Sequence, residues 1–576
     1  MSASEPTTRS LGAVYRKSIH PQEVQPPLKP APDLGFESRV LDGGKVLFEK
    51  DYAIPMRDGI TLYADVYRPI SILKTPTIVL FAPFGKHGAV PREKFKNMDV
   101  DFSKLSKYTY WELPDPLLWC GEYGYSLISV DPRGTWWSEG SEANYLSPEE
   151  GRDGYDVVEW VARQEWSTGK VGWGAVSYYA MSIYQTAVLR PPHLAAIMPW
   201  EGISDLYREV NTVGGIPNVP FQHLWMDMTG NGLRESEDHA VASIEHPLYD
   251  EWWQSKVVDW SKIDVPAFSV TGWSSLGLHL RGTIEAWKYF SSKNKYLLIH
   301  AGREWSEYYK AENIHKQKLF WDRFLKSTPN EVDSWPPVQY DVRTNLTNFT
   351  RHTSLTFPPP STLTTFTLSK NTLTPLNDLA AATKTPPASY QSYQSHRPTS
   401  SVSFSHTFQY RTEITGHAAA KLHIQCLHYP DTDLYLTLQK LVPMSPRHNN
   451  HQPQPQYQET KFHNRTQTAS ASAAHGWLRL SHRTLDPKAS TPSLPIHLHQ
   501  KRLWVRPCDV VEVQVELWPS STVWERGEVM RLVVKGAGDE EGEDRTVVKG
   551  PRHGFGEVRV WFGEGFESGV VVPVVG

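Results

Sequence analysis

The chain has 576 residues, of which 39% are hydrophobic and 21% charged, so it is a globular protein long enough for two or three domains. A formal net charge of −4 leaves no basic surplus for a nucleic-acid partner, and three scattered cysteines exclude a disulfide framework or a cysteine-based zinc site. No apolar run reaches the ~18 residues of a membrane-spanning helix, and the N-terminus lacks the apolar core of a secretory signal. We therefore expect a cytoplasmic protein without a membrane partner.

The N-terminal region changes character near residue 45. Residues 1–44 are rich in proline and polar side chains and predict an extended tail along the surface. Two β-rich runs follow, and the Asp58-Gly59 pair between them is typical of a hairpin turn. Continuous apolar runs at 77–83 and 125–134 then predict buried parallel strands.

Helical and strand patterns alternate in the next part of the chain. Residues 149–165 place apolar side chains at helical spacing, and a short strand at 170–176 leads directly into a helical run. This alternation predicts an α/β fold, with a parallel sheet covered by helices on both faces. Further strands are expected at 193–200, 265–273 and 295–302, and a closing helix at 314–326.

Two regions depart from this alternation. Residues 203–258 are rich in Trp, His and acidic residues and show no strand pattern, so we predict a helical insertion that encloses a largely apolar pocket. From residue 341 to 576, short β-rich runs between turn residues predict an antiparallel β-sandwich. Within it, 445–474 is of low complexity and predicts a flexible loop. Its histidines leave metal binding open, but we expect a solvated insertion and no metal or cofactor.

Ser177 is the residue with the clearest chemical signal. It stands between the strand at 170–176 and the following helix, where a sharp turn would lift its hydroxyl above the edge of the sheet. The N–H of the next residue would then be placed to stabilise an oxyanion. The local motif departs from G-x-S-x-G because Ala175 stands two residues before the serine, so by itself it is a weak signal.

Longer segments resemble the cocaine-esterase and X-Pro dipeptidyl-peptidase group of α/β-hydrolases, the CocE/NonD group. In chain order they are MRDGITLYADVYRP, YSLISVDPRGTWWSEG, EEGRDGYDVVEWVARQEWSTGKVGWGAVSY, HPLYDEWW, FQYRTEITGHAAAKLHI and PDTDLYLTLQKL. The resemblance implies an α/β-hydrolase core over 45–202 and 259–340, a helical cap over 203–258 and a jelly-roll β-sandwich over 341–576. It also implies cleavage of esters or amides through an acyl-enzyme on the elbow serine.

The same resemblance assigns the first site residues. Ser177 is the expected nucleophile, and the backbone N–H of Tyr178 is the expected oxyanion donor. The family's second oxyanion donor is a tyrosine hydroxyl, whereas this chain has Phe84, which has no donor. Phe84 is therefore expected in the wall of the substrate pocket.

The other triad positions also depart from the family pattern. Ser275 stands where an aspartate usually follows Trp273, and Glu304 stands at the place of the histidine. We expect His300, which ends a strand four residues earlier, to act as the base with Glu304 beside it, and give His279 a structural role. Trp273 and Ser275 are expected in the pocket wall.

Two functions remain open at this point. One is a serine hydrolase acting on an ester, amide or thioester of a small hydrophobic molecule. The other is a diverged member that binds a ligand or performs a cyclisation or acyl transfer in secondary metabolism. Loss of an oxyanion donor costs about 10²–10³ in rate and loss of the triad aspartate about 10⁴, which weighs against fast hydrolysis. Either way the partner is a small molecule, and the oligomeric state is unknown.

Overall fold

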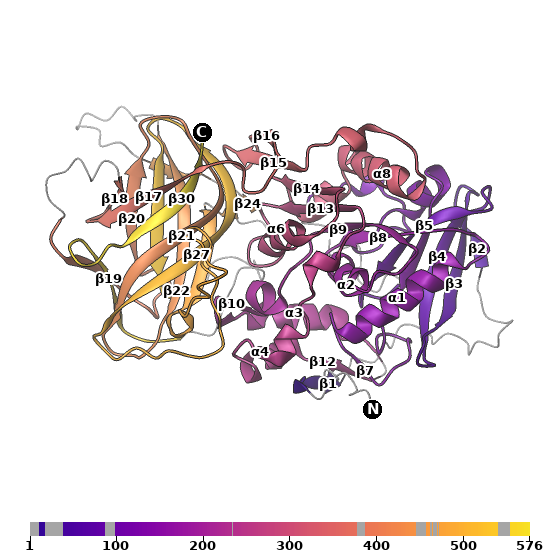
Figure 1. Ribbon diagram of the computed structural model, residues 1–576, viewed down its shortest axis with the longest axis horizontal. Helices are drawn as coiled ribbons and strands as arrows, with labels where there is room; N and C mark the ends of the chain where they lie inside the picture. The colour runs from indigo at the N-terminus through magenta and orange to yellow at the C-terminus, as the bar shows by residue number, and fades with distance from the viewer. Residues whose placement is uncertain are drawn as a thin grey trace.

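The protein is described here from a computed structural model that covers residues 11–17, 38–86, 98–232, 234–376, 386–444, 457–460, 463–464, 469–470, 472–538 and 553–576. An α/β unit and a β-sandwich lie side by side, the sandwich in orange and yellow (Figure 1). Most of the tail expected over 1–44 and of the loop expected over 445–474 lies outside the described residues. Within the described ranges, no helix is long and apolar enough to cross a membrane.

The α/β unit is built on one sheet with the strand order β3-β4-β6-β5-β8-β9-β13-β14-β15. Its strands are parallel from β6 to β15, and β3 and β4 form an antiparallel hairpin at one edge. Every residue of β5, β6 and β13 is buried, as expected for strands that helices cover on both faces. The strands are β3 (Val46–Pro55), β4 (Thr61–Pro69), β5 (Thr75–Phe81), β6 (Ser126–Val130), β8 (Ser167–Val176), β9 (Leu194–Trp200), β13 (Ala267–Gly272), β14 (Lys295–His300) and β15 (Val338–Arg343).

Helices flank this sheet. Helix α1 begins after Ser147, whose hydroxyl accepts a hydrogen bond from the backbone N–H of Glu150. Helices α1 and α2 pack closely at Gly151, which has no side chain to keep them apart. A Cβ atom at this position would lie only 2.4 Å from the carbonyl oxygen of Gln185. The helices are α1 (Pro148–Ala162), α2 (Tyr178–Ala187), α6 (Leu280–Tyr289), α7 (Glu304–Tyr308) and α8 (Ala311–Leu325).

The insertion between β9 and β13 is mainly helical, but the expectation that it has no strands is wrong. A two-residue hairpin turns at Gly214 and Gly215, whose φ angles of 60° and 85° match the left-handed pair that such turns require. A third strand, β12, pairs with β7 (Glu142–Ala143) and with β1 (Tyr15–Lys17). The elements are η5 (Tyr207–Asn211), β10 (Thr212–Val213), β11 (Ile216–Pro217), α3 (Val219–Thr229), β12 (Glu235–Glu237), α4 (His239–Glu245) and α5 (Glu251–Gln254).

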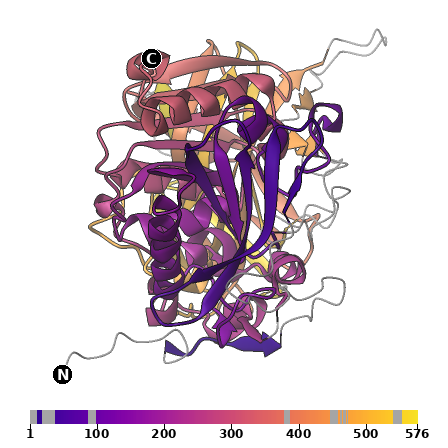
Figure 2. The same ribbon diagram turned by 90° about the vertical axis from the view of Figure 1, so that its right-hand side faces the viewer.

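The C-terminal part is a β-sandwich with its own apolar core, and Figure 2 shows the α/β sheet in front of it. Strand β21 pairs antiparallel with β27, β29 and β30, and β22 pairs antiparallel with β26 and β28. The predicted fold class is therefore confirmed. The strands are β16 (Phe349–Ser354), β17 (Thr362–Ser369), β18 (Thr372–Pro375), β19 (Ser389–Gln394), β20 (Ser401–Thr407), β21 (Thr412–Cys426), β22 (Asp433–Pro443), β23 (Tyr457–Glu459), β26 (Ser472–Arg479), β27 (Val510–Trp524), β28 (Val529–Lys535), β29 (Glu557–Phe562) and β30 (Gly569–Val575).

Candidate active site

Ser177 occupies the turn between β8 and α2 with φ 60° and ψ −120°. This backbone conformation is strained for a residue with a side chain, so the surroundings must hold it in place. The Ser177 N–H donates to the carbonyl oxygen of Trp200 at 2.9 Å, and the Ser177 carbonyl accepts from the N–H groups of Ala180 and Met181. The predicted elbow geometry is therefore confirmed, and the side chain is partly exposed at the carboxyl edge of the sheet.

The exposed side of Ser177 faces a small cavity between the sheet edge and the insertion. The cavity volume is about 30 Å³, which holds about one or two water molecules. Its wall is mostly apolar, and the insertion covers Ser177 in the way the sequence predicts. The lining side chains from the insertion are Leu206, Val210, Phe221, Gln222, Trp225 and His239, and those from the rest of the α/β unit include Leu146, Met181, Leu278 and His279.

Tyr178 begins α2 directly after the serine. The first N–H groups of a helix have no intrahelical acceptor, so the Tyr178 N–H can stabilise a negative oxygen at the elbow. The Tyr178 side chain is fully buried, its hydroxyl bonded to Glu150 Oε1 at 2.9 Å and its ring stacked on Trp225 with centroids 5.8 Å apart. The Phe84 ring is buried, with its centroid 6.4 Å from that of Tyr178, and it does not line the cavity.

The residues at the family's aspartate and histidine positions contact each other. The Ser275 hydroxyl donates to Glu304 Oε2 at 3.2 Å, and both side chains are buried. The loops after β13 and β14 therefore meet as in a triad, but they bring together a hydroxyl and a carboxylate. Ser275 does not line the cavity. Neither does Trp273, because its indole N–H donates to the Asp341 carbonyl and holds the ring against β15.

His300 is buried at the end of β14, away from the cavity wall. Because β9 and β13 lie between β14 and β8, three strand spacings of about 4.8 Å separate the backbones at His300 and Ser177. The ring lies over Gly272, and its Nε2 is 3.7 Å from Glu201 Oε1. Neither ring nitrogen has a hydrogen-bond partner among the described residues, and burial lowers the His300 pKa. Its role as base stays a prediction.

Glu112 is a further buried carboxyl group close to Glu304 and Glu201. Glu112 Oε1 accepts a hydrogen bond from the Trp305 indole at 2.8 Å. Burial raises the pKa of Glu112 well above its usual value, and repulsion from Glu304 and Glu201 adds to this effect. The protonated form of Glu112 is therefore favoured more than in an exposed glutamate. Within the part of the chain that the structure describes, no group of three or more His, Cys, Asp or Glu side chains could hold a metal ion.

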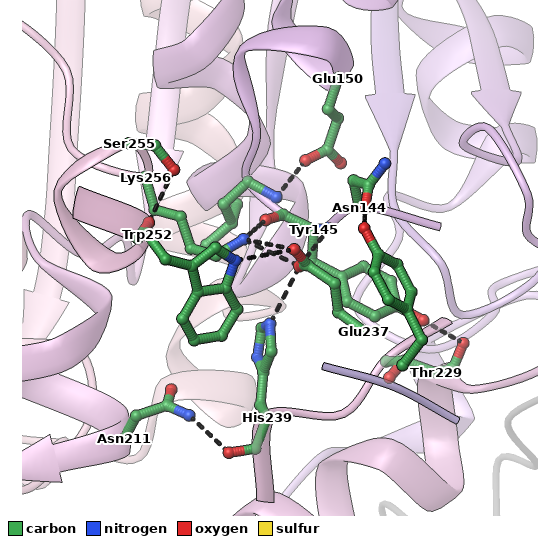
Figure 3. Close-up of polar contacts among 12 residues, drawn as sticks. Asn144, Tyr145, Glu150, Asn211, Thr229, Glu237, His239, Trp252, Ser255 and Lys256 are labelled. Carbon is green, nitrogen blue, oxygen red and sulfur yellow. Dashed lines mark hydrogen bonds and ion pairs between the residues drawn. The ribbon is translucent and has the colours of Figure 1, made fainter. Parts of the chain in front are cut away.

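The insertion contributes a polar cluster that the sequence analysis did not single out (Figure 3). His239 Nε2 lies 3.3 Å from Glu237 Oε2. Glu237 also accepts from Lys256 Nζ at 2.8 Å, the Tyr145 N–H at 2.9 Å and the Trp252 indole at 3.3 Å. The only sequence signal is the spacing Glu-x-His, which is too common to identify a site.

Comparisons with known proteins agree with this architecture. The chain matches the family models of X-Pro dipeptidyl-peptidase (S15 family) over residues 58–243 and of the X-Pro dipeptidyl-peptidase C-terminal non-catalytic domain over 330–546. The structure is similar to a CocE/NonD family hydrolase from Staphylococcus aureus, with a TM-score of 0.84 and 30% identity over 97% of this chain and 98% of that chain.

Cocaine esterase from Rhodococcus sp. (strain MB1 Bresler) is 31% identical over 188 residues. The match covers 32% of this chain and 29% of cocaine esterase, so it spans less than a third of that relative. An α-amino acid ester hydrolase has the same fold, with a TM-score of 0.66 at 14% identity over 96% of this chain and 100% of that chain.

Proposed function

Because this chain belongs to the CocE/NonD family of α/β-hydrolases, we propose that it cleaves an ester, amide or thioester of a small hydrophobic molecule through an acyl-enzyme on Ser177. The observation that carries this proposal is the strained turn at Ser177, whose side chain lines an apolar cavity. Backbone strain of this kind costs about 1–3 kcal/mol and persists where it serves a function. At an elbow it lifts the hydroxyl toward a substrate.

The chemistry follows from this placement. Ser177 Oγ attacks the carbonyl carbon of the substrate while a base accepts the hydroxyl proton. The Tyr178 N–H and the positive end of α2 stabilise the oxyanion, and the leaving group departs with the proton. A water molecule then attacks the acyl-serine, releases the carboxylic acid and restores the Ser177 hydroxyl. The sequence predicts His300, the last residue of β14, as this base.

The size of the cavity supports a short acyl group as the part of the substrate held beside Ser177. A volume of about 30 Å³ leaves no room for a long chain unless the insertion moves. The lining side chains offer little hydrogen bonding apart from Gln222 and two histidines, so an apolar group is favoured.

Labelling with a fluorophosphonate probe tests whether Ser177 is an activated nucleophile. We expect one covalent adduct on the wild-type chain by intact-mass spectrometry, and none on Ser177→Ala. The exposed Ser141→Ala serves as the matched control and should be labelled like the wild type. Hydrolysis of p-nitrophenyl acetate should follow the same pattern. An unlabelled wild-type protein would contradict the proposal and favour a non-hydrolytic function.

A further inference from the structure

Two histidines line the cavity beside Ser177, and one of them is held by a carboxylate. His239 is the first residue of α4, and His279 directly precedes α6. The His239 ring points toward Glu237, which also accepts a hydrogen bond from the Lys256 ammonium (Figure 3). A histidine with one nitrogen on a carboxylate and the other toward a nucleophile is the arrangement that general-base catalysis requires.

The hydrogen bonds around Glu237 determine which nitrogen of His239 carries the proton. Burial alone would raise the pKa of Glu237, but Lys256 and His239 outweigh it and hold the pKa below its usual value, so Glu237 is an anion. An anionic carboxylate accepts the proton of His239 Nε2, which leaves a lone pair on Nδ1. Nδ1 makes no hydrogen bond among the described residues, and the ring lines the cavity.

A stack of aromatic rings fixes the orientation of His239 relative to the elbow. The His239 ring is stacked on Trp225, with centroids 5.2 Å apart and an interplanar angle of 10°. Trp225 is stacked in turn on Tyr178, the residue after Ser177, at 5.8 Å. Tyr145 packs its edge against the His239 ring at 5.7 Å. The stack therefore runs from the Glu237–His239 pair to the residue that follows Ser177.

The charge of His239 is suited to a base. Burial lowers its pKa below the usual 6.5, and Lys256 lowers it further, while Glu237 and Asp238 act in the opposite direction. The charged groups that act on the ring are Glu237 of β12, Asp238 at the start of α4 and Lys256 in the segment after α5. His239 is consequently neutral at pH 7 and can accept a proton.

The other candidate bases lack part of this arrangement. His279 Nδ1 donates to the backbone carbonyl of Gly202 at 3.2 Å, and a neutral carbonyl stabilises an imidazolium less than a carboxylate does. His300 does not line the cavity and has two strands between its own strand and β8.

We infer that His239 is the general base for the reaction at Ser177 and that Glu237 orients it, with both supplied by the insertion. This inference rests on the proposed function of Ser177. The proton passes from Ser177 Oγ to His239 Nδ1, directly or through one water in the cavity, and then to the leaving group. In the second step Nδ1 accepts a proton from the attacking water and returns it to Ser177.

The rate of fluorophosphonate labelling tests the base directly. His239→Gln should label about 10²–10⁴-fold more slowly than the wild type, because a general base contributes a factor of that order. His246→Gln is a matched control at the C-cap of the same helix, since His246 also pairs with a carboxylate, Asp250, but does not line the cavity. It should label within about twofold of the wild type, and circular dichroism should show both variants folded.

The pH profile separates catalysis from a structural role. The wild-type labelling rate should be constant above the His239 pKa and fall as the pH drops through it, at a midpoint below 6.5. Glu237→Gln removes a group that raises this pKa, so the midpoint should move to lower pH and the plateau should fall. Added imidazole should restore labelling in His239→Ala. A packing role alone would change neither the midpoint nor the response to imidazole.

The outcomes distinguish this inference from the proposed function. An unlabelled wild-type protein would overturn both. If the wild type is labelled, the labelling rates of the variants decide between the bases. His239→Gln labelled as fast as the wild type, together with slow labelling of His279→Gln or His300→Gln, would overturn the role of His239. The proposed function would then remain in place.

Discussion

At the scale of single residues, the site depends on a charge pair removed from water. Lys256 Nζ lies 2.8 Å from Glu237 Oε2, and both side chains are fully buried. The Lys256 ammonium also donates to the Tyr145 carbonyl at 2.7 Å, which ties the insertion to the segment before α1. Removing one partner of such a pair leaves an uncompensated buried charge, which costs about 3–5 kcal/mol.

Lys256→Met should lower the free energy of unfolding by about 3–5 kcal/mol at pH 7, measured by urea denaturation. In the wild type, the folded pKa of Glu237 lies below its ordinary value of 4.5, so the pair stabilises above that pH and is lost as the pH falls through the folded pKa. Without Lys256 burial is opposed by fewer groups, so the folded pKa of Glu237 rises and the stability deficit should shrink as the pH is lowered.

Lys262→Met is the control for this measurement, because Lys262 and Asp259 form an exposed pair at 4.0 Å. It should change stability by less than about 1 kcal/mol. An equal loss in both variants, or a deficit independent of pH, would contradict the role of the buried charge.

At the scale of elements, helix α3 closes the cavity above Ser177. Phe221, Gln222 and Trp225 lie on one face of this helix and all line the cavity. His223 lies on the opposite face and is exposed. The position of α3 therefore sets the space for the acyl group, while its outer face is free to vary.

Phe221→Ala should enlarge the cavity and shift the preference from acetyl toward butyryl and hexanoyl esters. One added methylene in an apolar pocket is worth about 1–3 kcal/mol, so the ratio of kcat/KM between long and short esters should rise at least about tenfold. A series of p-nitrophenyl esters measures this ratio. His223→Ala should leave it unchanged, and an unchanged ratio in Phe221→Ala would show that the acyl group binds elsewhere.

At the scale of the whole molecule, Arg281 connects three parts of the chain. It lies on α6 and contacts Glu209 of the insertion at 2.9 Å and Glu516 of β27 at 3.0 Å. Arg343 of β15 adds a second link to the β-sandwich, donating to the Ser521 carbonyl at 3.1 Å. The sandwich is thus joined to α6 and β15 through buried and half-buried polar contacts.

Arg281→Met should destabilise the protein by about 3–5 kcal/mol, because it removes this cation from the fully buried Glu209 and the half-buried Glu516. Scanning calorimetry should show a lowered transition for the assembled molecule. Arg411→Met is the control, since Arg411 and Glu525 form an exposed pair and should contribute about 0–1 kcal/mol. If both variants melt like the wild type, Arg281 does not hold the parts together.

The sequence alone determined the features that depend on neighbours along the chain. The Asp58-Gly59 hairpin, the buried parallel strands and helix α1 follow from turn chemistry and periodicity, which act over a few residues. The elbow at Ser177 also follows, because a strand and a helix with only Ser177 between them force a sharp turn at that residue. The hairpin at Gly214-Gly215 was missed although its signal is local, since the flanking strands have only two residues each.

The tertiary structure alone decided which side chains meet Ser177. His300 stands at the expected strand end, yet its ring lies over Gly272, because a glycine there leaves room for it. His239 is distant from Ser177 in the sequence, and it reaches the cavity because the insertion folds back over the sheet edge (Figure 1). Its tautomer depends on a buried carboxylate held by Lys256. Such proximity and desolvation arise from the packing of distant segments, which no local pattern in the sequence encodes.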